Sequence, residues 1–389
     1  QEIPERQGIF YALFLLALAG LLGITLTGDA FNVFVFLEIS SLSTYALIAY
    51  GQDRRGLLAA FRYLIMGTIG ATFILIGIGF LYMMTGTLNM ADLAERIPAV
   101  ADTNAVRAGF AFIIVGLGLK LALLPLHLWL PNAYAFAPNV ITVFLAGTAT
   151  KVALYVMLRF IYTIFGGDYS FGAVPLASLM MVLAVAGMVV GSWVAMFEPN
   201  LKRMMAYSSV AQVGYLVLGV SLVSIIGLTA TFVHLFNHAL IKAGLFMALG
   251  TVMYRTGSAR IEAFYGIGRQ MPWTMTAFAL LGLSLIGVPA TAGFISKWYL
   301  IWGALDAGLA PLVVLILITS FMAVYYIWRV IEAAWFKPPK DGQAPVDEAP
   351  WALLIPLWLM VALNVYFGLD TRFSLTAAEQ AAQTLLGGF

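Results

Sequence analysis

The stretch GLGLKLALLPLHLWLP, residues 116–131, places a lysine and a proline inside an apolar run long enough to cross a lipid bilayer. Pro125 has no N–H to donate to the carbonyl four residues earlier, so a helix through this run must break. A second stretch, LIGVPATAGFISKW, residues 285–298, repeats the combination with Pro289 and Lys297. Carbonyls freed at membrane depth are tolerated only in a protein interior or around a wet cavity. Two broken helices that each carry a lysine are typical of secondary transporters.

The composition is that of a membrane protein. Hydrophobic residues make up 62% of the 389 residues and charged residues only 10%. Cysteine is absent, so the chain supplies no thiolate metal ligand, iron–sulfur cluster or thiol redox chemistry. The net charge of +2 is spread along the chain, and we expect no nucleic acid partner. Neither a Walker loop nor a dinucleotide fingerprint is present, and we expect neither a cofactor nor a metal.

Apolar runs long enough to span a bilayer occur eleven times, which predicts an all-α polytopic membrane protein. Ten of them form two five-helix repeats, residues 1–165 and 166–336, each with a broken helix as its fourth member. Because five crossings is an odd number, the second repeat must be inverted in the membrane. A polar linker at 337–349 and a C-terminal helix with its tail at 350–389 follow. The predicted spans are 8–27, 30–50, 57–84, 107–130, 139–165, 173–197, 203–223, 226–254, 274–302, 309–335 and 350–369.

The connections between the spans predict the orientation of the chain. The polar connection at 88–103 is expected to carry one short surface helix. Lys and Arg are about three times as frequent on the side of the N-terminus as on the opposite side. This bias predicts a multi-pass protein of the cell inner (plasma) membrane, with a cytoplasmic N-terminus and an external C-terminus. The lipid bilayer is therefore the first expected partner.

Five full charges lie deep within the apolar runs: Glu38, Lys120, Lys151, Lys242 and Lys297. Inserting one charge at the bilayer centre costs about 2.5–3.5 kcal/mol. Such residues usually mark a route for protons or ions, and four cations cannot all pair with one carboxylate. The alternative is that they form structural ion pairs that hold helices together.

The charges of the first repeat have two interpretations. Glu38 either modulates the protonation of a nearby lysine or forms a fixed salt bridge with one. Lys120 directly precedes the break, and we expect its segment to be unwound. A buried lysine can release its proton near neutral pH, so Lys120 and Lys151 are candidates for passing a proton laterally through water. His127 either joins them or makes interfacial hydrogen bonds.

In the second repeat, His234, His238 and Lys242 are four residues apart and share one helix face. Histidine titrates in the physiological range and can pass protons through its two ring nitrogens. The competing interpretations are plain core histidines and a zinc site, but neighbouring helices offer no carboxylate or cysteine to complete the latter. The pattern favours a proton relay that ends at Lys297. Polar residues of the preceding span are expected to make ordinary helix–helix hydrogen bonds: Ser208, Ser209 and Gln212.

Three motifs resemble the antiporter-like membrane subunits shared by respiratory complex I and Mrp-type sodium/proton antiporters. They are PLHLWLPNAYAFAP at 125–138, LKRMMAYSSVAQVGYLVLG at 201–219 and GVPATAGFISKWYL at 287–300. The stretch GDAFNVFVFLEISSLSTYALIAYG at 28–51 looks most like the D-type subunits of Mrp antiporters and their relatives in membrane-bound hydrogenases. The similarity covers essentially the entire sequence.

The resemblance implies a role for each intramembrane charge. Glu38 matches the fifth-helix glutamate of the family, Lys120 the lysine of the broken seventh helix, and Lys151 the eighth-helix lysine. The His234–Lys242 stripe matches the eleventh-helix relay, and Lys297 matches the terminal ionisable residue of the broken twelfth helix. The family normally has fourteen helices and an external N-terminus. We therefore expect three N-terminal helices to be missing or separately encoded.

The function implied by the resemblance is that of a proton-translocating subunit of a multisubunit monovalent cation/proton antiporter. Its partners would be other membrane subunits, protons, and sodium or another monovalent cation. The alternative is a proton-pumping subunit of a complex I-like NADH:quinone oxidoreductase or of a membrane-bound hydrogenase, where redox chemistry elsewhere drives the same residues. Both hypotheses use the same residues, and neither gives this chain active-site chemistry of its own.

Overall fold

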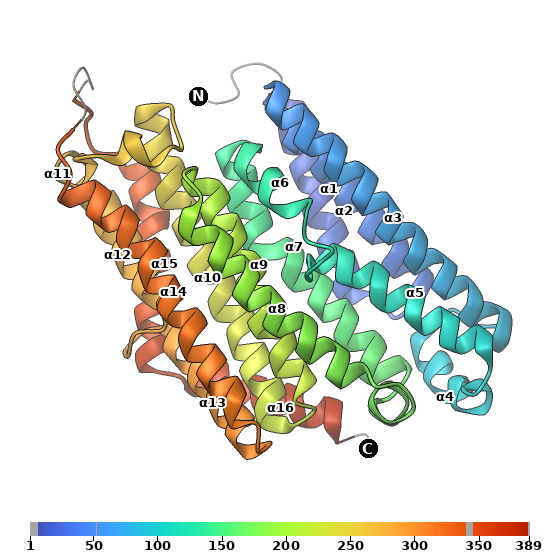
Figure 1. The fold of residues 1–389 in the computed structure, drawn as a ribbon. Coiled ribbons are helices and arrows are strands. Elements are labelled where there is room, and N and C mark those ends of the chain that lie inside the picture. The colour runs from blue at the N-terminus through green and yellow to red at the C-terminus, as the bar shows by residue number, and fades with distance from the viewer. Residues whose placement is uncertain (1–6, 52, 340–344, 388–389) are drawn as a thin grey trace. The chain divides into compact units, whose positions relative to one another are not determined.

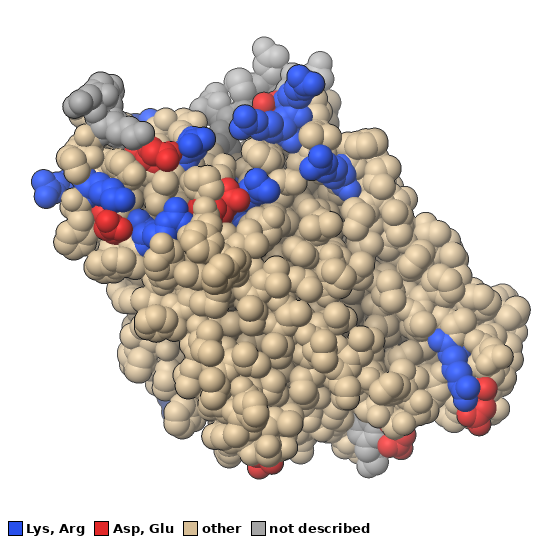
Figure 2. Space-filling view, in the orientation of Figure 1, with Lys and Arg blue, Asp and Glu red and all other residues tan. Residues whose placement is uncertain are grey.

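The computed structural model describes residues 7–51, 53–339 and 345–387. Nearly all of these residues are helical, and their only β-structure is two isolated bridges. Ten helices within the described residues are long and apolar enough to cross a membrane. The eleventh predicted span is the broken one at 274–302, which consists of two shorter helices. The predicted all-α membrane protein is confirmed, and charged side chains occupy only a small part of the face in Figure 2.

The chain divides into two compact units. The first comprises Gln1–Ile141, Thr148–Leu179 and Thr384–Phe389. In it, α2 packs against both α1 and α3, and α5 lies along α3 (Figure 1). Its helices are α1 (Gln7–Leu26), α2 (Ala30–Ala49), α3 (Arg54–Thr85), α4 (Met90–Val100), α5 (Asn104–Leu121), α6 (Leu130–Phe136), most of α7 (Asn139–Leu158) and the π-helical segments η1 (Arg159–Ile164) and η2 (Asp168–Ala173).

The second unit comprises Thr142–Gly147 and Met180–Gln383. Its central helix is α10, which packs against α9, α12, α13 and α15. Its helices are α8 (Leu176–Phe197, mostly in this unit), α9 (Leu201–Ser221), α10 (Ile225–Thr256), the 3-10 segment η3 (Ile261–Phe264), α11 (Ile267–Gln270), α12 (Pro272–Ile286), α13 (Ala292–Asp306), α14 (Ala310–Trp335), α15 (Trp351–Leu369) and α16 (Arg372–Leu386).

Both predicted helix breaks are present. In the first unit, α5 ends at Leu121, and a left-handed Ala122 starts the turns that lead to α6. In the second unit, α12 ends at Ile286 and α13 begins five residues beyond its C-cap, Gly287. The expectation that Lys120 is unwound is wrong, because Lys120 lies in the last turn of α5. Proline removes only the bond to the carbonyl of Leu121, so the residues before that point keep their helical bonds.

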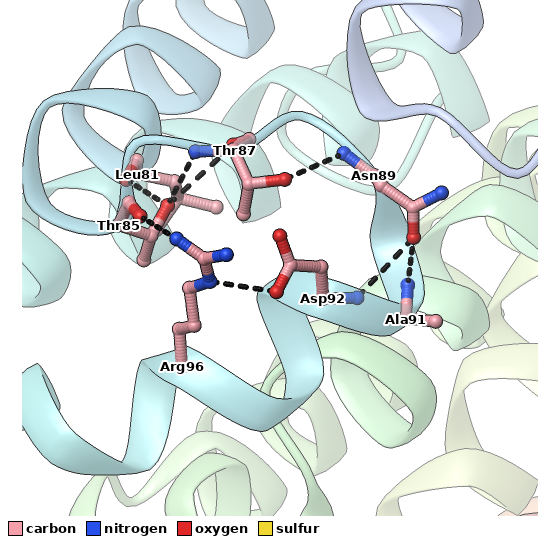
Figure 3. Close-up of polar contacts among 7 residues, drawn as sticks. All are labelled: Leu81, Thr85, Thr87, Asn89, Ala91, Asp92 and Arg96. Atoms are coloured by element: carbon pink, nitrogen blue, oxygen red, sulfur yellow. Dashed lines mark hydrogen bonds and ion pairs between the residues drawn. The ribbon is translucent and has the colours of Figure 1, made fainter.

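A hydrogen-bonded turn ends α3, the 32-residue helix of the first unit. The hydroxyl of Thr85 donates to the carbonyl of Leu81 at 2.7 Å, and Gly86 follows with a φ of 71°. The hydroxyl of Thr87 then accepts from the backbone N–H of Asn89 at 3.3 Å (Figure 3). Two hydroxyls and a left-handed glycine thus supply hydrogen-bond partners for backbone groups where the chain reverses.

The same turn ends α10, which also has 32 residues. The hydroxyl of Thr256 donates to the carbonyl of Val252 at 3.0 Å, and Gly257 has a φ of 69°. The hydroxyl of Ser258 accepts from the backbone N–H of Arg260 at 3.2 Å. The two turns share their sequence pattern, their left-handed glycine and their hydrogen bonds.

The predicted surface helix within 88–103 is α4. The side chain of Asn89 caps its N-terminus by accepting from two backbone N–H groups (Figure 3). Arg96 donates to the carboxylate of Asp92 at 2.6 Å and to the carbonyl of Thr85 at 3.0 Å, which ties α4 to the end of α3. Hydrogen bonds from Thr87 and Arg96 hold the pKa of Asp92 below its usual range.

The tail after the last span contains a helix that the sequence analysis did not predict. This helix, α16, buries one stripe of small side chains, Ser374, Ala378 and Ala382. The spacing of four residues puts all three on one face, so α16 packs closely through that face. Because its overall hydropathy is low, α16 does not form a long apolar run in the sequence.

Candidate functional site

The first unit holds a buried ion pair between α2 and α5. The ammonium of Lys120 donates to Oε1 of Glu38 at 3.3 Å and to the hydroxyl of Ser41 at 2.8 Å. The side chain of Lys120 is only 4% exposed, and that of Glu38 is 19% exposed. Ser41 lies three residues after Glu38, so both side chains face Lys120 from the same side of α2. Ser41 is not among the site residues predicted from the sequence.

The end of α5 that carries Lys120 is held by an aromatic stack. The indole N–H of Trp129 donates to the carbonyl of Leu119 at 2.8 Å. The indole ring stacks on Tyr63 with centroids 3.9 Å apart, and Tyr63 contacts Tyr45 edge-on at 4.6 Å. Trp129 follows the break, so the chain beyond the break returns to fix the turn that carries Lys120.

The other two candidates of the first unit are buried elsewhere. Lys151 lies in the middle of α7, and His127 lies in the turns between α5 and α6. Neither is a hydrogen-bond partner of Glu38 or Lys120 among the described residues. The structure therefore brings together two of the predicted charges of this unit and leaves Lys151 outside their direct contacts.

The second unit places the predicted stripe along α10. The rings of His234 and His238 are parallel, with centroids 5.7 Å apart. His234 Nδ1 is hydrogen-bonded to the hydroxyl of Ser296 on α13 at 2.8 Å. At the other end, Lys242 donates to the carbonyl of Met205 on α9 at 2.9 Å. The stripe thus runs from a contact with α13 to a contact with α9.

Lys242 has a second acceptor that the sequence analysis did not assign to the site. Its ammonium also donates to the hydroxyl of Ser208 on α9. Ser208 in turn donates to the carbonyl of Met205, so the three groups form a closed set of hydrogen bonds. Lys242 has no exposed surface, and neutral oxygens replace the water around its charge.

Lys297 projects from α13 back to the end of α12. Its ammonium donates to the carbonyls of Leu285 and Ile286 at 3.1 Å and 2.7 Å and to the hydroxyl of Ser320 at 3.0 Å. The ammonium lies 5.0 Å from the ring centroid of Tyr215. The prediction that the proline frees a carbonyl in this helix is confirmed, and the lysine of the same break binds it. All of its acceptors are neutral, in contrast to those of Lys120.

Neighbouring helices hold the two halves of this break. From α10, the side-chain amide of Asn237 donates to the carbonyl of Ala292 at 2.7 Å. Within the break, the N–H of Gly293 donates to the hydroxyl of Ser284 at 3.1 Å. The Ser284 hydroxyl donates to the side chain of Asn364 on α15 at 3.0 Å. The position of the break is therefore fixed by groups other than Lys297.

Three hydroxyl residues complete this cluster and were missed from the sequence. The hydroxyl of Tyr215 is hydrogen-bonded to that of Thr319 at 2.6 Å and to that of Ser320 at 3.3 Å. Thr319 and Ser320 could have been singled out from the sequence, because they are the only Ser or Thr residues of α14. Ser296, the partner of His234, could also have been singled out, because it directly precedes Lys297 in the sequence.

Comparisons with known proteins match nearly the whole chain. Residues 27–323 match the sequence model of the family described as NADH:quinone oxidoreductase/Mrp antiporter, TM. The chain is 46% identical to the N-type subunit of the NADH-quinone oxidoreductase of Desulforudis audaxviator, over 94% of this chain and 75% of that protein. It is 30% identical to the D-type subunit of the Na(+)/H(+) antiporter of Bacillus subtilis, over 98% of this chain and 77% of that protein.

The fold is also similar to a solved structure. A chain of the Mrp complex from Dietzia sp. matches with a TM-score of 0.89 and 28% identity, over 96% of this chain and 77% of that chain. The predicted resemblance to antiporter-like subunits is confirmed. Both types of complex that the sequence analysis considered are represented among these relatives.

The break of the second unit predicts a specific role for Gly287. Its φ of 94° is strained for any other residue, and a Cβ there would lie 2.9 Å from Cδ of Lys297. We expect Gly287→Ala to lower the free energy of unfolding by about 1–2 kcal/mol for the left-handed backbone, and by more for the contact. Gly308, with a φ of 71° and open space around it, is the matched control. Equal losses in Gly287→Ala and Gly308→Ala, measured by unfolding of the purified protein, would contradict the contact with Lys297.

Proposed function

The chain belongs to the NADH:quinone oxidoreductase/Mrp antiporter membrane family, and we propose that it moves protons along its intramembrane Glu, Lys and His residues. It acts as part of a multisubunit monovalent cation/proton antiporter, with other membrane subunits as partners. The observation that carries this proposal is the buried contact of Lys120 with Glu38 at 3.3 Å. The name of the Bacillus subtilis relative supports the antiporter assignment. The second transported ion is sodium or another monovalent cation.

The ion pair suits proton transfer because two opposing effects act on Lys120. A carboxylate within about 4–6 Å favours the charged form of a lysine, whereas burial favours the neutral form. A small displacement of Glu38 would change the balance between these two effects and therefore the fraction of Lys120 that carries a proton. Lys151, buried on α7 of the same unit, is the proposed next acceptor.

The second unit offers groups that both donate and accept protons. Imidazoles and hydroxyls have this property, and the cluster alternates them with lysines. His234 contacts Ser296, and the ring centroids of His234 and Tyr215 are 5.8 Å apart. Ser320 connects the hydroxyl of Tyr215 to the ammonium of Lys297. We propose that Lys242, His238 and His234 carry the proton to this group.

We also propose the division into an inverted pair of repeats, 1–165 and 166–336, followed by a linker at 337–349 and a C-terminal part at 350–389. The matched turns after α3 and α10 support it. The two isolated bridges give further support, since each joins the residue before α2 or α9 to the residue after the matched turn. These bridges are Asp29–Asn89 and Asn200–Arg260.

The second candidate function is proton pumping within a redox-driven complex. It is favoured by the 46% identity to a subunit of an NADH-quinone oxidoreductase, which exceeds the identity to the antiporter protein. Purifying the assembled complex and identifying its subunits distinguishes the two. Subunits that carry iron–sulfur clusters or flavin would favour the redox-driven complex, and an assembly without them would favour the antiporter.

The orientation is a proposal with a direct test. We propose a plasma membrane location with the N-terminus in the cytoplasm. Because the chain has no cysteine, single-cysteine variants need no altered background. An impermeant maleimide added outside should label Glu95→Cys on α4 and leave Arg269→Cys unlabelled until the membrane is opened. The reverse pattern would overturn the orientation.

The role of the carboxylate is tested at Glu38. We expect Glu38→Ala to reduce proton translocation by about 100-fold or more, because Lys120 loses its charged partner. Glu38→Asp should retain part of the activity, since the charge persists on a shorter side chain. The measurement is proton uptake into vesicles that contain equal amounts of assembled protein, with Glu95→Ala as the control. Wild-type uptake by Glu38→Ala would show that the carboxylate is structural.

Arginine substitutions separate proton transfer from helix pairing. The pKa of arginine exceeds about 12, so an arginine keeps its charge but cannot release its proton. We expect Lys120→Arg and Lys297→Arg to assemble and to transport protons poorly in the same vesicles. Lys337→Arg, outside the spans, should transport normally. If both intramembrane variants are fully active, the lysines only hold helices together.

A further inference from the structure

The ammonium of Lys297 occupies a group of oxygens that has the features of a cation site. We propose that the break between α12 and α13 is a binding site for a monovalent cation of ammonium or potassium size, and that Lys297 fills it as a tethered cation. This inference is independent of proton transfer. It concerns what the pocket binds, whether or not the lysine releases its proton.

The oxygens of the site come from the end of a helix. The carbonyls of Leu285 and Ile286 belong to the last turn of α12, where carbonyls have no partner within the helix. They also lie at the negative end of the helix dipole. With the hydroxyl of Ser320, they supply three acceptors, which equals the number of donors on an ammonium group.

The surroundings favour a cation by charge. The face of the Tyr215 ring lies 5.0 Å from the ammonium, and such a face attracts a free cation as it attracts a tethered one. The hydroxyl of Tyr215 is held by Thr319 at 2.6 Å, so the ring stays in place without the lysine. In transporters with broken helices, unwound carbonyls and half-helix C-termini coordinate the transported cation.

The distances and the charges of the oxygens select the class of ion. The three nitrogen–oxygen distances are 2.7 to 3.1 Å. These are longer than the roughly 2.0–2.6 Å that magnesium and calcium require. All three oxygens are neutral, whereas hard divalent cations are usually bound through carboxylates. The site therefore fits a large monovalent cation better than a divalent one.

The oxygens should remain in place when the ammonium is removed. The break is held by hydrogen bonds from Asn237 to the carbonyl of Ala292 and from the N–H of Gly293 to the hydroxyl of Ser284. On α15, Asn364 accepts from Ser284, and Gly368 packs against the break. A Cβ on Gly368 would lie 2.5 Å from the backbone of Thr291, so α15 already packs against the turn of the break. Without the lysine, the buried carbonyl of Leu285 and the part-buried carbonyl of Ile286 would lose their donor, which favours binding of a free cation.

The test removes the tethered cation and supplies a free one. We expect the unfolding temperature of full-length Lys297→Ala to rise saturably with ammonium or potassium chloride, and less with sodium chloride. N-methylglucamine chloride at equal ionic strength should have no such effect. Wild-type protein, whose site is filled, should not respond selectively. Lys242→Ala is the matched control, because the hydrogen bonds of Lys242 to Met205 and Ser208 lie within α9 and not at a helix end.

A second variant separates loss of the ammonium from loss of side-chain packing. Lys297→Met retains the apolar part of the side chain that packs on Gly287 and removes only the ammonium. Adding Ser320→Ala to either variant removes one acceptor, so several-fold more ammonium should be needed for half the rise. The same response to every salt in the variants and in the wild type would overturn the proposal. So would failure of both variants to fold even in ammonium chloride. Because the readout is stability, full transport by Lys297→Arg would refute the relay without affecting this result.

Discussion

Inside a lipid bilayer, each backbone carbonyl must find a donor within the protein, because no water is available to bond to it. This chain creates the problem twice, where Pro125 and Pro289 interrupt spans. At the first break, the carbonyl of Leu119 accepts from the backbone N–H of Ala122 and also from the indole N–H of Trp129. At the second break, the ammonium of Lys297 donates hydrogen bonds to two carbonyls. Lys297 itself satisfies carbonyls at the second break, and Lys120 directly follows the residue whose carbonyl Trp129 binds at the first.

The hydrogen bonds of Lys297 at the second break require small residues within the break and polar side chains on the neighbouring helices. Gly287 must be a glycine because the stem of Lys297 crosses it, and its φ of 94° excludes other residues without strain. Gly293 must be small because a Cβ would collide with the carbonyl of Ser284. The polar side chains of α10 and α15 then lock the two half-helices together. The break is thus a rigid element of the second unit and not a loose connection.

The sequence predicts features whose energetic cost depends only on a residue and its immediate neighbours in the sequence. Proline within an apolar run predicts a break, and a charge within such a run predicts a site, because each is expensive where it stands. The ion pair of Glu38 with Lys120 involves two such residues, so its members could be named without a structure. The end of α5 relative to Lys120 could not be predicted in this way, because one lost hydrogen bond does not fix where a helix ends.

The partners of the charges depend on packing, which the sequence does not reveal. Ser320 reaches Lys297 from α14, and Ser208 reaches Lys242 from α9. Serine and threonine occur in many apolar helices and often bond to their own backbone, as Ser209 does here. Only the rotation of each helix about its axis decides which hydroxyl meets an ammonium. The amphipathic α16 was missed for a different reason, since it is too polar for a search that looks for membrane spans.

The proposed loss of a proton would have different electrostatic consequences at the two lysines of the breaks. Lys120 donates to the hydroxyl of Ser41 and to the carboxylate of Glu38, so departure of its proton would leave a net negative charge between α2 and α5. Around Lys297, every acceptor is neutral, and departure of the proton leaves no net charge at the end of α12. A deprotonated Lys120 would therefore attract the next proton through the field of Glu38, and a deprotonated Lys297 would have no such carboxylate beside it. The two breaks would therefore differ in how strongly they attract a returning proton, and this difference arises from the one carboxylate beside Lys120.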